Sequence, residues 1–498
     1  MSRRALAATA LALLLAGCAV GPDFKPPAAP AVTGFTPEPL APDTATAGDV
    51  TGGAVQHFAV GQDIPGEWWT LFQSEPLNTL VAEALKSNPD LAAAQAALRQ
   101  ARELAKAQTG VFLPQVDASF QHEREKANGL AFGLPNDQGI FSVNTAQLNV
   151  AYTVDVFGGE RRQLESAVAQ AEYERFQLEA AYLTLTSNVV AAAVTEASLR
   201  AQIAATEDII GAEQKQLDVL NQQFQLGGVA KSAVLEEAAT LAQLRATLPP
   251  LQKQLAQQCN RIAALAGRFP SQETAQKFDL ASLTLPVDLP VSLPSRLVEQ
   301  RPDVQAAAAQ LHEASANVGV ATANMLPQFN ITGDIGSTAA MVGGLFAGGT
   351  GIWALAEGVT APIFHGGTLL HQKRAAEAAY DEATAQYRST VLTAFQNVAD
   401  ALRALQADAA ALQASADAAR AAAESYALAR DQFRLGAVSY LTLLDSQRVD
   451  QQARIALAQA QGNRYADTAA LFQALGGGWW NRTDVATNQT APSQDKPQ

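Results

Sequence analysis

The sequence predicts a mainly α-helical protein that also carries membrane β-strands and is built from two similar halves. Three observations support this prediction: short motifs that occur twice in the same order, long runs of apolar residues at seven-residue spacing, and two pairs of segments in which apolar and polar residues alternate. The chain has 498 residues, of which only 6% are aromatic and 16% are charged. A composition dominated by Ala, Gln and Leu favours long helices that contact each other through small side chains.

Five short motifs occur twice, with offsets between 207 and 213 residues. In the first half they are Asn88–Leu91, Phe112–Gln115, Phe157–Gly159, Gln223–Gly227 and Ala264–Gly267. Their counterparts are Arg301–Val304, Met325–Gln328, Phe364–Gly367, Gln432–Gly436 and Ala474–Gly477. A repeat of this length is too long for a solenoid unit. We therefore expect two architectural halves, residues 67–267 and 293–478, joined by a linker at 268–292.

The N-terminus has the pattern of a secretory signal peptide, which we expect to span residues 1–17. Its apolar stretch, Ala5–Leu15, is shorter than the ~20 residues that a membrane-spanning helix needs. The stretch ends in Leu15-Ala16-Gly17-Cys18, which resembles the lipobox of bacterial lipoproteins, in which the cysteine is acylated and becomes the mature N-terminus. We expect Cys18 to carry a covalent lipid and expect no other cofactor; an ordinary signal peptide beside an unrelated cysteine is the alternative.

The segments outside the two halves lack periodicity. Residues 18–66 are rich in Pro, Ala, Thr and Gly, which predicts a lipidated, extended tether. Ala19, rather than Asp, follows the cysteine, and by resemblance to enterobacterial lipoproteins this permits sorting to the outer membrane. Residues 479–498 are expected to form a C-terminal tail.

Each half is predicted to contain a long helical hairpin. In the second half, apolar residues follow each other at seven-residue spacing: Val391, Val398, Leu405, Leu412, Ala419, Tyr426 and Phe433. The first half keeps the same register with Ile203, Ile210, Leu217 and Phe224. These seams predict coiled-coil-like packing, and a helix from about Gly159 to Leu226 would have ~65 residues and a length of ~100 Å. We expect turns at 226–230 and 435–439 and a kink at Pro249-Pro250.

Two strand pairs are predicted, at about 113–157 and about 326–363. In Ala146–Val156 every second residue is apolar, and the residues between them are mostly polar. This alternation fits a barrel wall with lipid outside and water inside, although a half-buried sheet on a soluble core gives the same pattern. The apolar stretch Ala339–Ala356 contains five glycines, which argues against a membrane helix. We expect a surface loop there that runs into the fourth strand, Gly351–Ile363.

Four strands in one chain cannot close a barrel, because an open sheet has two edges whose backbone groups would be unsatisfied in lipid. We therefore expect the chain to pool its strands with those of other copies. Two copies would supply 8 strands, which close too narrowly for a wide duct, whereas three copies supply 12. The predicted assembly is a homotrimer with a 12-stranded β-barrel, continued by a closed tube of long helices.

The duplicated plan of a strand pair followed by a helical hairpin resembles the TolC-type outer-membrane efflux proteins. The lipobox, Gly66-Glu67-Trp68-Trp69 with Phe72, and Pro249-Pro250-Leu251 resemble the lipoprotein branch of that family, the NodT-like components of tripartite pumps. The resemblance covers about residues 18–480. It implies a passive, gated channel in the outer membrane of a Gram-negative bacterium, extending into the periplasm. Such channels export drugs, toxic compounds or metal ions, together with a periplasmic adaptor and an inner-membrane transporter of the resistance-nodulation-division class.

The hairpin turns are the first functional region that the resemblance indicates. The turns are Leu226-Gly227-Gly228-Val229 and Leu435-Gly436-Ala437-Val438. Glycine after an apolar helix end is expected to adopt the left-handed capping conformation. The resemblance implies that the adaptor contacts both turns; the simplest alternative is that they only close a hairpin.

The second region follows the second turn. Leu441 and Asp445 are four residues apart and share a helix face, so each would form a ring of three in a trimer. The resemblance implies that these positions, with Tyr440 and Arg448, constrict the tunnel mouth. Three close carboxylates would hold cations or protons there. A solvated Asp445 that pairs with Arg448 or Arg434 is the alternative.

The sequence argues against nucleic-acid binding and catalysis. The net charge of -14 disfavours nucleic acid, because a phosphate-binding surface needs a basic face. The histidines lack partners at metal-site spacing, and no phosphate-binding loop occurs, so we expect neither an enzyme nor a metal site. Two other functions remain: a trimeric structural or adhesive coiled-coil lipoprotein, which would have no need for the strand pairs, and the duct of an ATP-driven polypeptide secretion system.

Overall fold

The computed structural model describes residues 19–48, 50–126, 140–272 and 276–482. The chain divides into two compact units, which we call the strand unit and the hairpin unit. The strand unit comprises residues 1–27, 97–175 and 306–388, and the hairpin unit comprises residues 28–96, 176–305 and 389–498. The predicted signal peptide, Cys18 and the end of the C-terminal tail lie outside the described residues.

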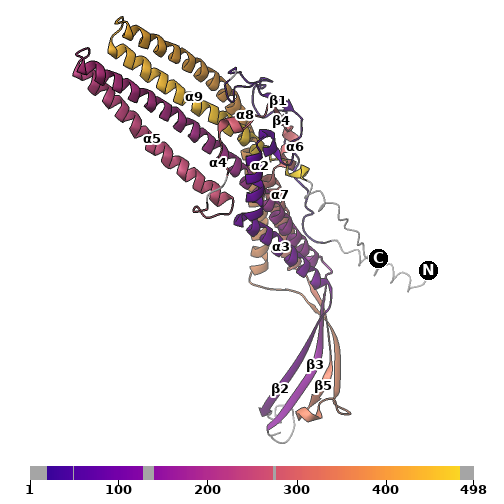
Figure 1. The fold of residues 1–498 in the computed structure, drawn as a ribbon. Coiled ribbons are helices and arrows are strands. Elements are labelled where there is room, and N and C mark those ends of the chain that lie inside the picture. Colours follow the sequence, from indigo (N-terminus) through magenta and orange to yellow (C-terminus); the bar gives the residue numbers. More distant parts are fainter. Residues whose placement is uncertain (1–18, 49, 127–139, 273–275, 483–498) are drawn as a thin grey trace. The chain divides into compact units, whose positions relative to one another are not determined.

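The helices repeat in the two halves of the chain (Figure 1). The first half contains α2 (Glu75–Ser87), α3 (Pro89–Thr109), α4 (Gly159–Gln225) and α5 (Lys231–Leu265). The second half contains α6 (Pro294–Gln300), α7 (Pro302–Ala323), α8 (Thr368–Arg434) and α9 (Tyr440–Ala474). Short 3-10 helices are η1 (Trp68–Phe72), η2 (Gly110–Phe112), η4 (Leu280–Ser282), η5 (Val342–Gly344) and η6 (Trp479–Asn481). Because α4 and α8 each have 67 residues, the predicted duplication is present in the fold.

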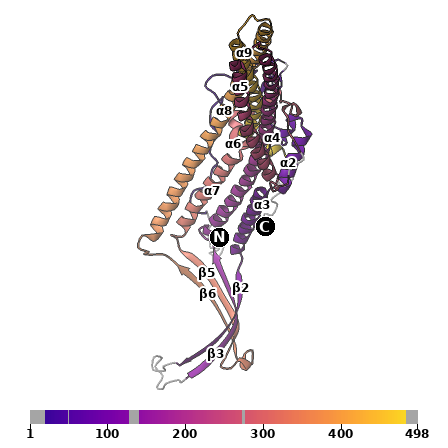
Figure 2. The same ribbon diagram turned by 60° about the vertical axis from the view of Figure 1, so that its left-hand side comes forward.

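Four strands of the strand unit form one antiparallel sheet in the order β2-β3-β5-β6 (Figure 2). The strands are β2 (Gln115–Lys126), β3 (Ile140–Val154), β5 (Gln328–Ala339) and β6 (Gly351–Thr360). The four strands expected per chain are confirmed. The pairing of β3 with β5, in the register Leu148↔Ile335, joins the two halves of the sequence. Among the described strands, β2 and β6 each pair on one side only, so they form the edges of the sheet.

One face of this sheet is apolar and open. The register places Phe120, Leu148, Ile335 and Trp353 on this face. All four side chains are exposed, and Trp353 reaches 78% exposure. A soluble core would cover such residues, so the half-buried alternative for these strands is wrong within the protomer, and lipid is the expected neighbour.

The other face is polar, and its side chains bond to each other. Asn149 Nδ2 donates to Ser119 Oγ at 2.9 Å, which links β3 to β2. Thr153 Oγ1 donates to Asn330 Oδ1 at 2.9 Å, which links β3 to β5. This face is suited to contact water, as a barrel interior does.

The apolar segment before β6 is a loop, as its glycines predict. Ser337 Oγ donates to Thr350 Oγ1 at 2.8 Å, and it accepts from the backbone N–H of Phe346 at 3.0 Å. These bonds hold the loop closed on itself. Among the described helices, α4 alone is long and apolar enough to cross a membrane by length and composition, and half of its most apolar window is buried.

Only one of the two predicted helical seams is buried in the predicted register. Along α8 the predicted positions Val391, Val398, Leu405 and Leu412 are buried. Along α4 the predicted positions are half-buried or exposed, and the buried face is instead Gln202, Thr206, Ile209, Glu213 and Leu220. This face tolerates polar residues because they find partners; Thr206 Oγ1, for example, donates to the carbonyl of Gln202 at 2.7 Å.

Aromatic residues form a core in the hairpin unit. Trp68 is fully buried and stacks on Phe472 of α9, with ring centroids 5.2 Å apart. Nearby in sequence, β1 (His57–Val60) pairs in parallel with β4 (Asp288–Val291). Part of the segment expected to be a tether is therefore a strand, and it is paired with the linker between the halves.

Candidate functional site

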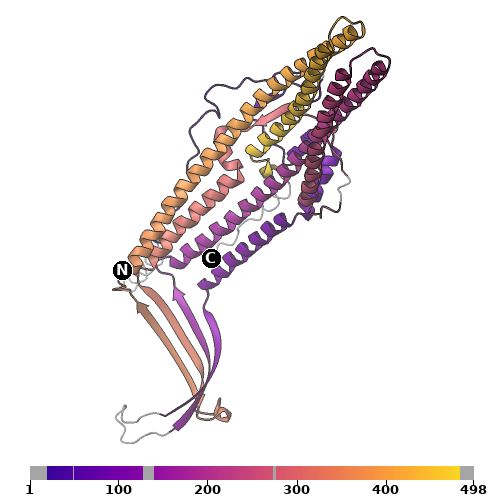
Figure 3. The same ribbon diagram turned by 90° about the vertical axis from the view of Figure 1, so that its left-hand side faces the viewer.

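Both hairpins turn through a left-handed glycine, as predicted, and the two turns can be followed in Figure 3. Gly227 has a φ of +73° and Gly436 a φ of +71°. In the first turn the N–H groups of Gly227 and Gly228 donate to the carbonyls of Phe224 (3.0 Å) and Gln223 (2.8 Å). These bonds satisfy the last carbonyls of α4, and the second turn has the same pattern. The flanking Leu226 and Leu435 are exposed, so the turns present apolar side chains. Their contact with an adaptor stays a prediction.

Three of the four predicted gate residues line one pocket. Leu441, Asp445 and Arg448 lie with α5 residues around a pocket of about 310 Å³. Leu441 is 73% exposed, so it is free to contact another copy of the chain. Asp445 accepts from Arg448 Nη2 at 2.7 Å, whereas Arg434 pairs with Asp431. The alternative expected for Asp445, an exposed pair with Arg448, is therefore present in the protomer, and the gate role stays a prediction.

The fourth gate residue, Tyr440, is not part of that pocket. Its hydroxyl donates to Glu237 Oε2 of α5 at 2.5 Å. Burial, followed by the hydrogen bond to Glu237, raises the pKa of Tyr440, so the hydroxyl keeps its proton. The start of α9 thus has one side bonded to α5 and another side, carrying Leu441, exposed.

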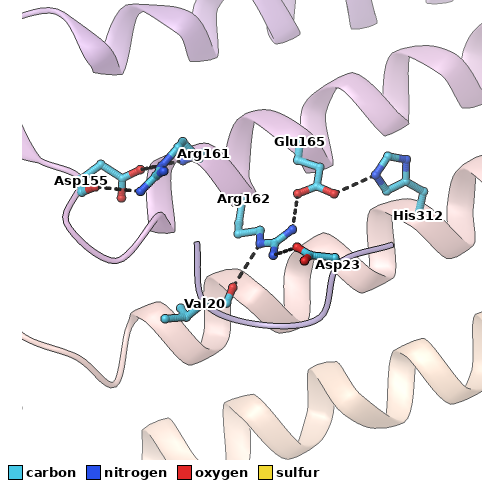
Figure 4. A network of polar contacts seen from close by, with 7 residues as sticks. All are labelled: Val20, Asp23, Asp155, Arg161, Arg162, Glu165 and His312. Carbon is cyan, nitrogen blue, oxygen red and sulfur yellow. Dashed lines mark hydrogen bonds and ion pairs between the residues drawn. The ribbon is translucent and has the colours of Figure 1, made fainter. Parts of the chain in front are cut away.

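The chain just after Cys18 is bound to the strand unit. The N–H of Val20 donates to the carbonyl of Phe157 at 3.0 Å. Arg162, at the start of α4, donates to the carbonyl of Val20 at 3.1 Å and pairs with Asp23 at 2.8 Å (Figure 4). The same guanidinium pairs with Glu165 at 2.7 Å, and its side chain is only 5% exposed.

Close packing accompanies this network. Glu165 also bonds to His312 Nε2 at 2.8 Å, and His312 stacks on Phe24 with ring centroids 4.3 Å apart. Gly21 lies against Gly319 of α7: a Cβ on Gly21 would meet the Gly319 backbone, and a Cβ on Gly319 would meet the Arg162 side chain. Sequence patterns did not indicate this docking, because its partners are 137 or more residues apart in the sequence. The lipidation of Cys18 stays a prediction.

Within the part of the chain that the structure describes, no group of three or more His, Cys, Asp or Glu side chains is placed to hold a metal ion. The candidate functional features are therefore the two-faced sheet, the docked N-terminal segment, the hairpin turns and the first turns of α9.

Comparison with known proteins agrees with this plan. The family model for the outer membrane efflux protein matches residues 80–268 and 293–477. The chain is 30% identical over 500 residues to the toluene efflux pump outer membrane protein TtgC of Pseudomonas putida, and the alignment covers 100% of both chains. It is 27% identical to the cation efflux system protein CusC of Escherichia coli O6:H1, with 94% and 97% of the two chains covered.

A solved structure with the same fold is that of the outer-membrane channel OprN. Its TM-score is 0.83 at 28% identity, and the match covers 93% of this chain and 100% of the other. The family model matches most of the chain, in two segments, and a relative is 30% identical over the full length. This chain belongs to the outer membrane efflux protein family.

Proposed function

We propose that three copies of this chain form the outer-membrane duct of a tripartite efflux pump. The observation that carries the proposal is the four-stranded sheet, which has an exposed apolar face, a polar face and two edge strands. Three such sheets close a barrel in which lipid covers the apolar face and water the polar face. The duct is passive, and the chain has no catalytic role.

The cargo is small molecules, because relatives serve pumps named for toluene and for cations. A duct that passes both need not bind either. Selection then belongs to the inner-membrane transporter, of the resistance-nodulation-division class, and a periplasmic adaptor joins it to the duct at the turns around Gly227 and Gly436. Leu441, Asp445, Arg448 and Tyr440 act as the gate at the tunnel mouth, where rings of Leu441 and Asp445 form in the trimer.

The mature chain is anchored by a lipid on Cys18. Support comes from the docking of Val20 and Asp23 on Arg162, which fixes the chain two residues after the cysteine. Val20 bonds to Phe157, three residues after β3 ends, so the acyl chains are held next to the membrane strands, where buried methylenes contribute about 0.8 kcal/mol each.

Export by whole cells tests the proposal. The chain is expressed with its cognate adaptor and transporter in cells that lack their own outer-membrane efflux channels. We expect lower accumulation of a fluorescent substrate than in cells with adaptor and transporter alone. Equal accumulation, with the trimer verified in the outer membrane, would refute the duct. Palmitate labelling of wild type beside Cys18→Ser tests the anchor separately.

A further inference from the structure

Two glutamates of the hairpin unit are buried without a basic partner. Glu213 of α4 is 2% exposed, and Glu237 of α5 is 0% exposed. Neither forms an ion pair with a described Lys or Arg. A buried carboxylate without a cation is costly, so these groups need another explanation.

The two carboxyl groups contact each other and are both bonded to α9. Gln451 Nε2 donates to Glu213 Oε1 at 2.7 Å, and Tyr440 Oη donates to Glu237 Oε2 at 2.5 Å. The remaining oxygens, Glu213 Oε2 and Glu237 Oε1, receive no donor from any described residue. The two carboxyl groups nevertheless lie within hydrogen-bonding reach of each other. Because ionised carboxylates only accept, this contact is a hydrogen bond only when one of them carries a proton.

The surroundings favour that proton. Burial, and then the contact with Glu237, raise the pKa of Glu213 to about 8. The titratable and charged groups that face the pair from the neighbouring helices are Glu236 of α5, Tyr426 and Arg430 of α8, and Tyr440 and Asp450 of α9. Arg454 pairs with Asp450 at 2.9 Å. The neighbourhood therefore offers little positive charge to a second carboxylate.

We propose that Glu213 and Glu237 share one proton, and that this proton latches the start of α9 to α4 and α5. Loss of the proton to water leaves two buried negative charges in contact, which repel. The repulsion is relieved when the carboxyl groups separate and gain water. Since α9 supplies a donor to each carboxyl group, the separation moves α9 as well.

This inference rests on the proposed gate, because it regulates the same helix. Tyr440 precedes Leu441 directly, and Gln451 lies six residues after Asp445. Between the two donors, Gln447 shares their face of α9 by its spacing, and it is 2% exposed with both side-chain polar atoms unpaired among the described residues. Gln447 thus supplies an unused donor and an unused acceptor for a second arrangement of these helices. The latch holds at low pH and is released as pH rises through about 8.

Conductance of the reconstituted full-length trimer, measured from about pH 6 to about pH 10, tests the latch. All proteins carry Asp445→Asn, which removes the ionisable carboxyl groups of the gate ring itself. Glu213→Gln keeps the shape, cannot ionise and can donate to Glu237. Proton occupancy changes about tenfold per pH unit beyond the pKa. The parent is the Asp445→Asn protein with Glu213 intact. We therefore expect the parent current to rise several-fold from about pH 7 to about pH 9, and the Glu213→Gln current to change less than about twofold.

Glu236→Gln is the matched control, since Glu236 is exposed beside Glu237, and its current should follow the parent. An unchanged rise in Glu213→Gln overturns the latch. The latch is also overturned if millimolar Mg²⁺ abolishes the rise in current at fixed pH and EDTA restores it, because a cation would then bridge the carboxyl groups. If no protein conducts, the duct itself fails.

Infrared spectroscopy tests the shared proton independently of conduction. The Asp445→Asn parent should show a carboxylic-acid C=O band that disappears through about pH 8 and is absent from Glu213→Gln. If Glu213→Gln does not fold, Glu237→Gln serves in both experiments. A parent without this titrating band overturns the proposal.

Discussion

The hydroxyl of Tyr440 donates to the carboxylate of Glu237 at 2.5 Å, and this bond joins the start of α9 to α5 across 203 residues of sequence. Glu237 is fully buried, so it depends on this donor. The bond holds one side of the first turn of α9 while Leu441 stays exposed.

Tyr440→Phe removes this donor and leaves a buried acceptor unsatisfied. We expect a loss of about 1–3 kcal/mol in the stability of the hairpin unit, because the desolvated carboxyl group is no longer compensated. Thermal unfolding of the purified protein measures the loss. Tyr426→Phe is the control, since the Tyr426 hydroxyl makes no hydrogen bond with a described residue. Equal effects in the two variants would contradict the account.

Gly227→Ala and Gly228→Ala separate backbone conformation from side-chain space at the first turn. Gly227 has a φ of +73°, whereas Gly228 does not adopt a positive φ. Alanine at Gly227 is expected to cost about 1–2 kcal/mol, because left-handed backbone strains any residue with a Cβ. Hydrogen exchange at the ends of α4 and α5 should speed up in Gly227→Ala and change less in Gly228→Ala. The reverse order would show that the cap does not hold the turn.

Leu148→Arg and Asn149→Arg test which face of the sheet contacts lipid. Leu148 lies on the apolar face and Asn149 on the polar face. Arginine on the lipid side near the bilayer midplane costs about 2–4 kcal/mol, so we expect Leu148→Arg to reduce the membrane-inserted trimer. Asn149→Arg should insert and shift ion selectivity toward anions. The amount of heat-stable trimer on gels measures insertion, and the reversal potential measures ion selectivity. If Leu148→Arg inserts and Asn149→Arg inserts poorly, the two faces are assigned the wrong way round.

Gly319→Ala is expected to release the docked N-terminal segment. An added Cβ would meet Arg162 Cγ at 2.7 Å. The displaced Arg162 then loses its bonds to Val20 and Asp23, so limited proteolysis should cut residues 19–27 sooner than in wild type. Gly211→Ala, in open space on α4, is the control and should leave this cleavage unchanged. Equal protection in Gly319→Ala would argue against a tight dock.

The fold was predictable where its signal is local and repeated. Alternation along Ala146–Val154 is a property of one strand, and the spacing of Val391, Val398 and Leu405 belongs to one helix, so both could be read without tertiary information. The trimer followed from the unsatisfied edges of a four-stranded sheet.

The remaining features depend on contacts between distant segments. The seven-residue spacing of Ile203 and Ile210 predicted the wrong buried face for α4. The buried face instead includes Glu213 and Gln202, which have hydrogen-bond partners on α9. Spacing along one helix cannot reveal such partners. In the same way, the docking of Asp23 on Arg162 is accompanied by a close approach of Gly21 and Gly319, which come from the first and last segments of the strand unit.

Single-channel conductance of the purified trimer in a planar bilayer, wild type beside Asp445→Ala, tests the central claim most directly. A gated duct predicts a small, cation-selective current in wild type, because a carboxylate ring attracts cations and keeps the mouth narrow. The current should grow in Asp445→Ala. No current from either protein, in a verified membrane-inserted trimer, would contradict the duct and favour a structural lipoprotein stalk.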